Sequence, residues 1–425
     1  MTLRRRRARC DGKRISKLPN ESGGAWRLAL VSIALSAAGA CAESPTRPGR
    51  DGRTPGQFIW RVTDVHARTR PGVGATLVIV VDAERRVQAF DQRTGQARWS
   101  TPLPGSASSD IMPDVAVVGG HVVVGVDAVH GLDLASGAVR WTHALPAGQR
   151  LGALLVASDE ATVYLPTRGP DASVRAIEVG SGQLRWAAVA PAGRAPGSAA
   201  IVFDPVVHDD AVVFTYARNP ALLGSPEPQE GGVVVVDRAT GRPRWTRAFD
   251  LLSTSPAPAT AMSGPAAGHG RVYASAGHGA VYAFDAASGR TLWVDSADAR
   301  DGPEAGSIRP VAVEPAGAAG AGSAARPVRL YVSTWQGEMR ALDAATGARL
   351  WTIPPLHGTT FTMTATLNGL FAVHIGGQLS GLDRTGSVRV AVRPPVGYGF
   401  FFAPRIVGDT IFAAGRGGLW AIQGF

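Results

Sequence analysis

The sequence predicts an all-β fold, an eight-bladed β-propeller with four antiparallel strands per blade. A short unit recurs eight times along the 425 residues, and each interval holds about four strand-sized apolar runs. Past residue 60 there is no sustained i, i+3, i+4, i+7 apolar pattern, which argues against helices. The 53 glycines and 30 prolines fit a chain with many turns. A period near 40 residues with four strands per unit is typical of a propeller.

The first element, residues 1–40, is predicted to be a signal peptide that is removed from the mature protein. Basic residues from Arg4 to Arg27 precede an apolar run at 28–38. This run is too short to span a bilayer and has the length of a signal-peptide core. The mature protein is therefore expected to lie outside the cytoplasm.

The apolar run ends in the sequence AGAC, Ala38 to Cys41, which resembles the bacterial lipobox. The resemblance implies that Cys41 is lipidated and becomes the new N-terminus, although Ala38 stands where a lipobox usually has Leu. Ala42 follows instead of Asp, and by the same resemblance this favours the outer membrane, with the protein facing the periplasm. Residues 41–55 are polar and rich in Pro, Gly and Arg, and we expect a disordered tether.

The net charge of +10 does not indicate a nucleic-acid partner. Residues 1–40 contain nine Lys or Arg and two Asp or Glu, so residues 41–425 contain 34 (43 − 9) against 31 (33 − 2). Nucleic-acid binding would need a basic stripe on the folded part, and the sequence contains none.

The propeller is predicted to span residues 56–425, and its eight repeats align on an acidic residue or its equivalent. These positions are Asp91, Asp133, Glu178, Asp237, Asp285, Asp343, Asp383 and Gln423. Apolar residues stand four and one before this position in every copy, so that both faces of the third strand are apolar. A propeller blade buries both faces because it is wedged between two neighbours. Two before it the residue is Ala or Gly, except for Val235, and we expect it to allow close approach where blades converge.

The acidic position opens a predicted turn, of the form Asp-x-x-Thr/Ser-Gly in the complete copies. Asp accepts hydrogen bonds from backbone amides two or three residues on, and Gly supplies a positive φ. The predicted turn residues are Asp91, Gly95, Asp133, Gly137, Asp237, Gly241, Asp285, Gly289, Asp343 and Gly347. A Trp ends each complete copy, and its recurrence in every repeat favours a structural role over a binding role. The predicted structural tryptophans are Trp60, Trp99, Trp141, Trp186, Trp245, Trp293 and Trp351.

The last repeat stops at its third strand, residues 419–423, and lacks a fourth. Near the other end, residues 56–62 read as a strand that contains Trp60 but has no third strand before it. Trp60 precedes Asp91 by 31 residues, almost the separation of Trp351 from Asp383. We therefore predict that residues 56–62 pair with 419–423 and close the ring, which leaves no long unpaired edge.

The repeated unit, as in VYAFDAASGRTLW at 281–293, resembles the PQQ-type (quinoprotein) propeller repeat with its tryptophan-docking motif. Together with the lipobox, the chain is most similar to the BamB-like lipoproteins of the outer-membrane β-barrel assembly machinery. That resemblance implies a non-catalytic scaffold that binds a membrane-associated protein, and we expect a monomeric propeller.

Two other functions remain open: a PQQ-dependent dehydrogenase, and a periplasmic propeller that binds a glycan or another ligand. The dehydrogenases are similar in having a vicinal Cys pair and axial Ca²⁺ ligands, whereas no Cys follows Cys41 here. We expect no PQQ, no metal and no catalytic residue. The scattered acids are interpreted as surface or turn residues; they are Asp114, Asp127, Asp204, Glu338 and Asp409.

His278 and His374 lie near strand starts, where they would either face the central channel or fill structural positions, and the structural role is the more common. The loops are unequal in length. The apolar segments at 221–223 and 251–255 would either bind a partner or pack on the ring. The Ala/Gly-rich segment at 314–327 is predicted to be disordered.

Overall fold

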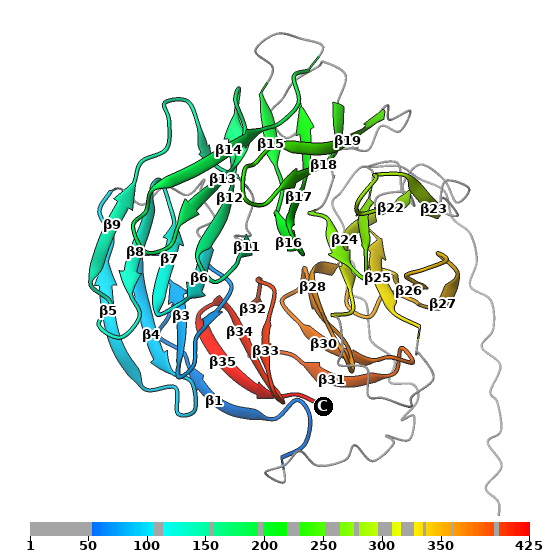
Figure 1. Ribbon diagram of the computed structural model, residues 1–425. Coiled ribbons are helices and arrows are strands. Elements are labelled where there is room, and N and C mark those ends of the chain that lie inside the picture. Colours follow the sequence, from blue (N-terminus) through cyan, green and yellow to red (C-terminus); the bar gives the residue numbers. More distant parts are fainter. Residues whose placement is uncertain are drawn as a thin grey trace, which may run out of the picture. The chain divides into compact units, whose positions relative to one another are not determined.

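A computed structural model gives the structure of the protein, and all its described residues lie in one compact unit, residues 46–425. It describes residues 53–105, 114–152, 157–193, 199–218, 230–250, 264–275, 280–295, 308–315, 327–334, 337–358, 360–394 and 399–425. All the regular secondary structure in these ranges consists of β-strands, which confirms the predicted all-β class. The strands form antiparallel sheets that succeed one another along the chain (Figure 1).

The first complete sheet shows how the repeat folds. It contains β2 (Gly72–Val73), β3 (Leu77–Val81), β4 (Arg86–Asp91) and β5 (Ala97–Pro102), in that order. All five residues of β3 are buried, while β5 alternates between exposed and half-buried positions. The apolar runs of the sequence therefore form the inner strands, and the fourth strand of the repeat is the outer edge.

Four further sheets repeat this order of four strands. The second contains β6 (Asp114–Val118), β7 (His121–Gly125), β8 (Val129–Asp133) and β9 (Val139–His143). The fifth repeat contains β20 (Ala266–Gly268), β21 (Arg271–Ser275), β22 (Val281–Asp285) and β23 (Thr291–Asp295). The sixth contains β24 (Ile308–Val313), β25 (Arg329–Thr334), β26 (Met339–Asp343) and β27 (Arg349–Ile353). The seventh contains β28 (Thr360–Thr366), β29 (Gly369–His374), β30 (Leu379–Asp383) and β31 (Val388–Val392).

Repeats three and four depart from the predicted four-stranded pattern because they share one ten-stranded sheet. The third repeat supplies β10 (Arg150–Leu151), β11 (Ala157–Ser158), β12 (Thr162–Gly169), β13 (Ser173–Glu178) and β14 (Leu184–Val189). The fourth supplies β15 (Ala200–Val202), β16 (Val206–His208), β17 (Ala211–Arg218), β18 (Glu230–Asp237) and β19 (Pro243–Asp250). The two repeats join because β12 is eight residues long and its end pairs with β15, Arg168 opposite Ile201. The lengths of individual strands were not predictable from the repeat pattern.

The last sheet combines both ends of the propeller. It contains β32 (Gly399–Phe400), β33 (Arg405–Val407), β34 (Thr410–Arg416), β35 (Gly418–Gln423) and β1 (Phe58–Val62). β1 runs antiparallel to β35, with Trp60 opposite Ala421 and Val62 opposite Leu419 (Figure 1). The Gly56 and Gln423 backbones extend the pairing through a hydrogen bond of 2.8 Å. The predicted closure by an N-terminal strand is confirmed.

The core lies between the sheets and not within one of them. Eight clusters of buried apolar residues each join two consecutive repeats, and one of them joins the last sheet to the first. In that cluster Phe412 and Leu419 pack with Val78 and Phe90. The sheets therefore succeed one another in a closed cycle, which is the arrangement of a β-propeller.

Candidate functional site

The turn after the third strand of the first repeat is held together by its acidic residue. One carboxylate oxygen of Asp91 accepts hydrogen bonds from the backbone N–H groups of Arg93 and Thr94 and from the Thr94 hydroxyl, at 2.9 to 3.1 Å. The other oxygen accepts from Arg98 at 2.6 Å. These bonds, the one from Arg98 first, hold the pKa of Asp91 well below its usual range. Asp91 is thus an ionised structural anchor.

The same turn recurs six more times with the same chemistry. The acidic residues of these turns are Asp133, Glu178, Asp237, Asp285, Asp343 and Asp383, each bonded to a Ser or Thr hydroxyl. The bond from the Ser136 backbone contributes most to lowering the pKa of Asp133, to about 2. We call the edge of the sheets that carries these seven turns the turn face.

Each predicted tryptophan contacts the turn of the following repeat. Trp60 Nε1 donates to the Gln92 carbonyl at 3.0 Å, and its ring covers Gly95, where a Cβ would lie 2.8 Å from the ring. The other indoles bond to carbonyls in the same way: Trp99 to Leu134, Trp141 to Val179, Trp186 to Arg238, Trp245 to Ala286, Trp293 to Ala344 and Trp351 to Arg384. The structure thus brings each predicted Trp together with the turn glycine of the next repeat. We call each of these seven contacts a docked junction.

Glycine is required in these turns for two reasons. The backbone φ of Gly241 is +69°, a left-handed conformation, and an added Cβ would lie 2.6 Å from the Trp186 ring. Either effect disfavours any other residue. The tryptophan of one repeat therefore requires a glycine in the turn of the next.

One junction lacks this contact. The fourth strand of the seventh repeat carries Val390 in place of Trp, and Gln423 of the last sheet is followed by no turn. Here Val390, Phe371, Phe400 and Trp420 form a buried cluster, in which the rings of Phe400 and Trp420 meet edge to face. We call this the undocked junction.

The small residue two before each acid has a role that the sequence did not reveal. It lies opposite the Trp of its own repeat: Ala89 pairs with Trp99, and Gly131 with Trp141. A Cβ at Gly131 would lie 2.0 Å from the Trp141 ring. The small residue leaves room for the indole across the strand pair.

An arginine of the motif was missed by the sequence analysis. Five repeats place Arg directly before the final Trp or Val, where it forms an ion pair with the turn carboxylate. The pairs are Arg98–Asp91, Arg140–Asp133, Arg185–Glu178, Arg244–Asp237 and Arg389–Asp383. The signal was present, since four copies end in the letters RW.

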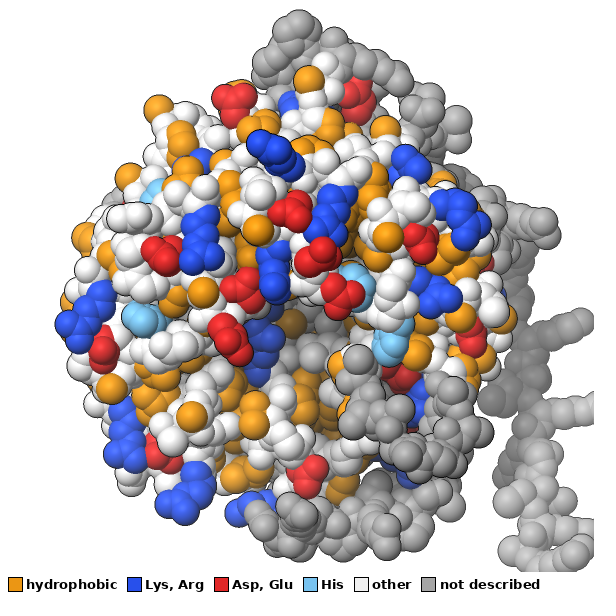
Figure 2. All heavy atoms as spheres, viewed as in Figure 1, with side chains coloured by type: hydrophobic (Ala, Val, Ile, Leu, Met, Phe, Trp, Pro, Cys, Tyr) orange, Lys and Arg blue, Asp and Glu red, His pale blue; other side chains and the backbone are white. Residues whose placement is uncertain are grey.

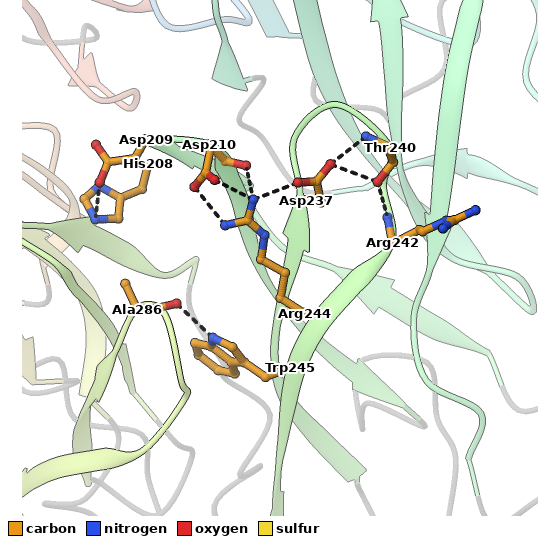
Figure 3. Close-up of polar contacts among 9 residues, drawn as sticks. All are labelled: His208, Asp209, Asp210, Asp237, Thr240, Arg242, Arg244, Trp245 and Ala286. Atoms are coloured by element: carbon orange, nitrogen blue, oxygen red, sulfur yellow. Dashed lines mark hydrogen bonds and ion pairs between the residues drawn. The ribbon is translucent and has the colours of Figure 1, made fainter.

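The fourth repeat extends this pair into a three-residue network (Figure 3). Arg244 donates to Asp237 at 2.7 Å and, through both terminal nitrogens, to Asp210 at 2.7 and 2.8 Å. The two carboxylates, Asp210 first, raise the pKa of Arg244. Asp210 lies in the turn that precedes β17, so the guanidinium bridges two turns of one repeat. The side chain of Asp210 is 76% exposed, so the network contributes little to stability and mainly sets surface charge.

The surface in Figure 2 shows acidic side chains and arginines interspersed, without a large region of one sign, around a hollow. The two lysines of the chain lie outside the described residues, so the basic side chains described are all arginines.

The last sheet has a pocket of about 270 Å³ where its turn would be. We call it the seam pocket. Its lining residues are Arg53, Ile59, Gln92, Arg93, Asp409, Thr410 and Gln423. They come from the entering chain, the first repeat and the last sheet, which meet only at the ring closure.

Two of the acids considered as metal ligands form ion pairs with arginines. Asp114, expected on the surface or in a turn, is instead 5% exposed and forms a two-bond ion pair with Arg70 at 3.0 Å. This ion pair joins the segment that precedes β2 in the first repeat to β6 of the second, which no local pattern could reveal. Asp127 pairs with Arg85 at 2.6 Å. Within the described ranges, no group of three or more His, Cys, Asp or Glu is arranged to hold a metal.

His374 occupies a structural position. It is fully buried in β29, and its Nε2 lies 3.0 Å from the Ser380 hydroxyl. Burial, with a further contribution from His357, lowers the pKa of His374 to about 4, so the ring is neutral at pH 7.

Several predictions fall outside the described residues. These concern the signal peptide, Cys41 and most of the tether, His278, the segments at 221–223 and 251–255, and 316–326 of the Ala/Gly-rich loop. In the part of the chain that is described, no helix has the length and apolar character needed to cross a membrane.

The closed cycle of sheets and the docked tryptophans define the class of this protein: a β-propeller built from tryptophan-docking repeats. The chain belongs to the PQQ_2 family, described as "Outer membrane protein assembly factor BamB". The family profile matches residues 52–150 and 83–305, together more than half of the chain. No curated protein sequence matches the chain significantly.

Solved structures share the fold at low sequence identity. BamB from Moraxella catarrhalis superposes with a TM-score of 0.60 at 14% identity and covers 86% of this chain and 99% of its own. The computationally designed Ika8 protein gives 0.61 at 12% identity, covering 87% and 99%. Quinohemoprotein alcohol dehydrogenase from Comamonas testosteroni gives 0.59 at 14% identity, covering 86% and 76%. An outer-membrane assembly factor, a design and an enzyme thus share this fold, so the fold alone does not define the function.

Proposed function

We propose that this protein is a non-catalytic, lipid-anchored scaffold outside the cytoplasm that serves outer-membrane β-barrel assembly in the manner of BamB. The mature chain is a monomeric propeller attached to the outer membrane through Cys41 and facing the periplasm. Family membership over residues 52–305 supports the assembly role. The signal-like segment at 28–38, followed by Cys41, supports the anchor.

The proposed ring has eight blades. Eight sequence repeats and eight inter-repeat clusters support this number, with the ten-stranded sheet counted as two blades. The pairing of β12 with β15 then joins two blades at their ends, and a cluster of buried apolar residues lies between them as at the other junctions.

One observation carries the scaffold proposal: the polar groups of the repeated motif form their hydrogen bonds within the propeller itself. Three polar groups recur in the repeats: the indole N–H, the carboxylate and the turn hydroxyl. They form hydrogen bonds within the protein, as Trp245 and Asp237 do (Figure 3). The docked junctions brace consecutive sheets, and the surface loops are then carried on a rigid frame. Rigid frames with variable loops are suited to binding other proteins.

PQQ, the cofactor of dehydrogenases that share this fold, does not fit the described residues. Of the acids considered, Asp114 is already paired with Arg70, and Asp127 with Arg85. Both cysteines of the sequence, Cys10 and Cys41, precede β1. We therefore propose no cofactor and no metal.

Cross-linking of the lipoprotein in detergent-solubilised membranes tests the scaffold role. We expect a membrane-protein partner to co-purify with the intact protein, and much less of it with the Cys41→Ser variant, which stays unanchored. Recovery of the propeller alone, with no cross-linked partner, would contradict the proposal.

Titration with PQQ and Ca²⁺ tests the enzymatic alternative separately. We expect no quinone absorbance to remain with the protein after gel filtration at micromolar cofactor. If the protein retains PQQ and oxidises an alcohol, the scaffold proposal is wrong and the protein is a dehydrogenase.

A further inference from the structure

One arginine of the third repeat is buried without an acidic partner. Arg175, in the middle of β13, is only 7% exposed, and its Nε is enclosed without a hydrogen bond. Among the described residues, no hydrogen bond and no ion pair engages its guanidinium. Burial lowers the pKa of Arg175, which is the effect of removing a charge from water. Proteins seldom bury a charge unless it is paired, so a partner for this arginine is missing.

The side chain of Arg175 points into the junction between the second and third repeats. It lies opposite Leu165, which belongs to the buried cluster that joins these two repeats. His143, at the end of β9, lies opposite Val129 of the same cluster. Burial first, and then the charge of Arg175, lower the pKa of His143, while the Gly182 carbonyl opposes the shift. The two side chains therefore meet across the junction, and His143 Nε2 is also buried without a hydrogen bond.

The junction between the fifth and sixth repeats shows the same arrangement with its anions present. In the strand registers, Arg340 and Asp295 hold the positions of Arg175 and His143. Burial, the largest cause, lowers the pKa of Arg340 to about 10, and the charge of Asp295 opposes this shift. Glu338, two residues before Arg340, forms an ion pair with it. A buried arginine at this position is thus balanced by two carboxylates.

The third repeat has neither of these carboxylates. His143 stands in the place of Asp295, and Ser173 stands in the place of Glu338, two residues before the arginine. The lowered pKa of His143 leaves its imidazole neutral at pH 7. A hydroxyl and a neutral imidazole cannot balance a guanidinium, so Arg175 keeps the position of a paired arginine without its anions.

We propose that a carboxylate group from outside the chain binds between the second and third repeats and pairs with Arg175. A carboxylate matches the planar fork of a guanidinium and accepts hydrogen bonds without needing to donate any. This suits Arg175 Nε and His143 Nε2, two enclosed nitrogens that have no hydrogen-bond partner. Because only 7% of Arg175 is exposed, the group that reaches it must be small. The carboxylate has two sources, a free small carboxylate or the acidic side chain of a bound protein.

Thermal melting of the full mature chain at pH 7, in sodium acetate and in sodium chloride at equal ionic strength, tests the site. We expect about 100 mM acetate to raise the melting temperature by about 2 °C relative to chloride. Arg175→Met should lose this difference, and it should melt no lower than the parent in chloride because it removes an unpaired buried charge. Equal melting of the parent in the two salts would overturn the proposal. A difference that Arg175→Met retains would be a general salt effect and would overturn it too.

His143→Asp supplies the missing carboxylate from within the chain, as Asp295 does for Arg340. We expect it to raise the melting temperature in chloride by about 2 °C and to abolish the response to acetate. His66→Asp makes the same change of charge at an exposed position and is the matched control, which should respond to acetate as the parent does. A His143→Asp variant that still responds to acetate would overturn the assignment to Arg175.

N-acetylglutamate α-amide, which carries one side-chain carboxylate on a peptide-like backbone, separates the two sources. Stabilisation equal to that by acetate supports the acidic side chain of a protein. Stabilisation by acetate alone would overturn that source and keep the free carboxylate. Because these assays use the purified protein without membrane or partner, failure here leaves the scaffold role to its own cross-linking test.

Discussion

The docked junctions and the undocked junction both join consecutive repeats, but they do so through different contacts. At a docked junction, a Trp such as Trp186 covers a turn glycine and bonds to a backbone carbonyl of the next repeat. At the undocked junction, Val390 packs with Phe371, Phe400 and Trp420 and makes no such polar contact. The docked contact depends on a matching pair, whereas the undocked contact is general apolar burial. The first should be intolerant of small changes and the second more adaptable.

The largest effect should come from removing the closing strand. Deleting residues 56–62 removes β1 from the last sheet together with the Trp60 docked junction, and it exposes the edge of β35. We expect the melting temperature to fall by more than about 10 °C, or soluble protein to be lost. Deleting residues 42–50 instead should leave the melting curve unchanged. Equal melting of the two deletions would show that the ring does not depend on β1.

A single methyl group should break one docked junction. Gly241→Ala places a Cβ 2.6 Å from the Trp186 ring at a φ of +69°. Backbone strain and overlap together should cost about 4 kcal/mol of unfolding free energy. Gly270→Ala is the matched control, since its φ is +70° and no atom lies within 4 Å of the added Cβ. It should cost about 1 kcal/mol, measured by urea denaturation. Equal costs would mean that the indole moves aside.

Acid should weaken the region of the undocked junction first. His374 of the seventh repeat has its pKa lowered to about 4 by burial, from an ordinary value of 6.5. The unfolded chain therefore binds more protons between these values, and stability falls as the pH drops from 6.5 toward 4, by about 3 kcal/mol in total. The docked turns respond later, because the pKa of Asp133 is lowered to about 2 and its contribution is lost only below about pH 4.

Urea denaturation of His374→Gln at pH 7 and pH 4.5 checks this prediction. Glutamine stays neutral and keeps a group that can bond to the Ser380 hydroxyl. The variant should lose less stability than the parent between the two pH values. An identical pH dependence would assign the acid response to another group.

The smallest effect should come from removing one indole hydrogen bond. Trp245→Phe keeps most of the ring but leaves the Ala286 carbonyl without its 2.9 Å bond. We expect a loss of about 1 kcal/mol in unfolding free energy. Val139→Ala, on the exposed fourth strand of the second repeat, is the control and should change it by less than about 0.5 kcal/mol. If the Trp245→Phe variant is as stable as its parent, the indole hydrogen bond contributes nothing, and the docked junction is stabilised by apolar contact alone.

The sequence was sufficient for the features that depend on local pattern. The strand–turn–strand unit, the turn glycines and the closure through Trp60 all follow from short spacings that every repeat imposes alike. The Asp114–Arg70 pair and the seam pocket were not predictable, because they join residues of different repeats whose distance is set only by the closed ring. The arginine before four of the tryptophans could have been found, since Arg98 and Arg244 stand at the same offset from Asp91 and Asp237.

The pairing of β1 with β35 also dictates the order in which the molecule can be made. Among the described strands, the first to leave the ribosome must wait for the last, more than 350 residues later, before its backbone groups are paired. Contacts so distant along the chain form slowly, because the intervening loop must close first. Throughout this interval β1 and the edges of the open ring are unpaired strands, which are prone to aggregation. A chaperone that covers residues 56–62 until β35 has formed would protect the step on which the whole ring depends.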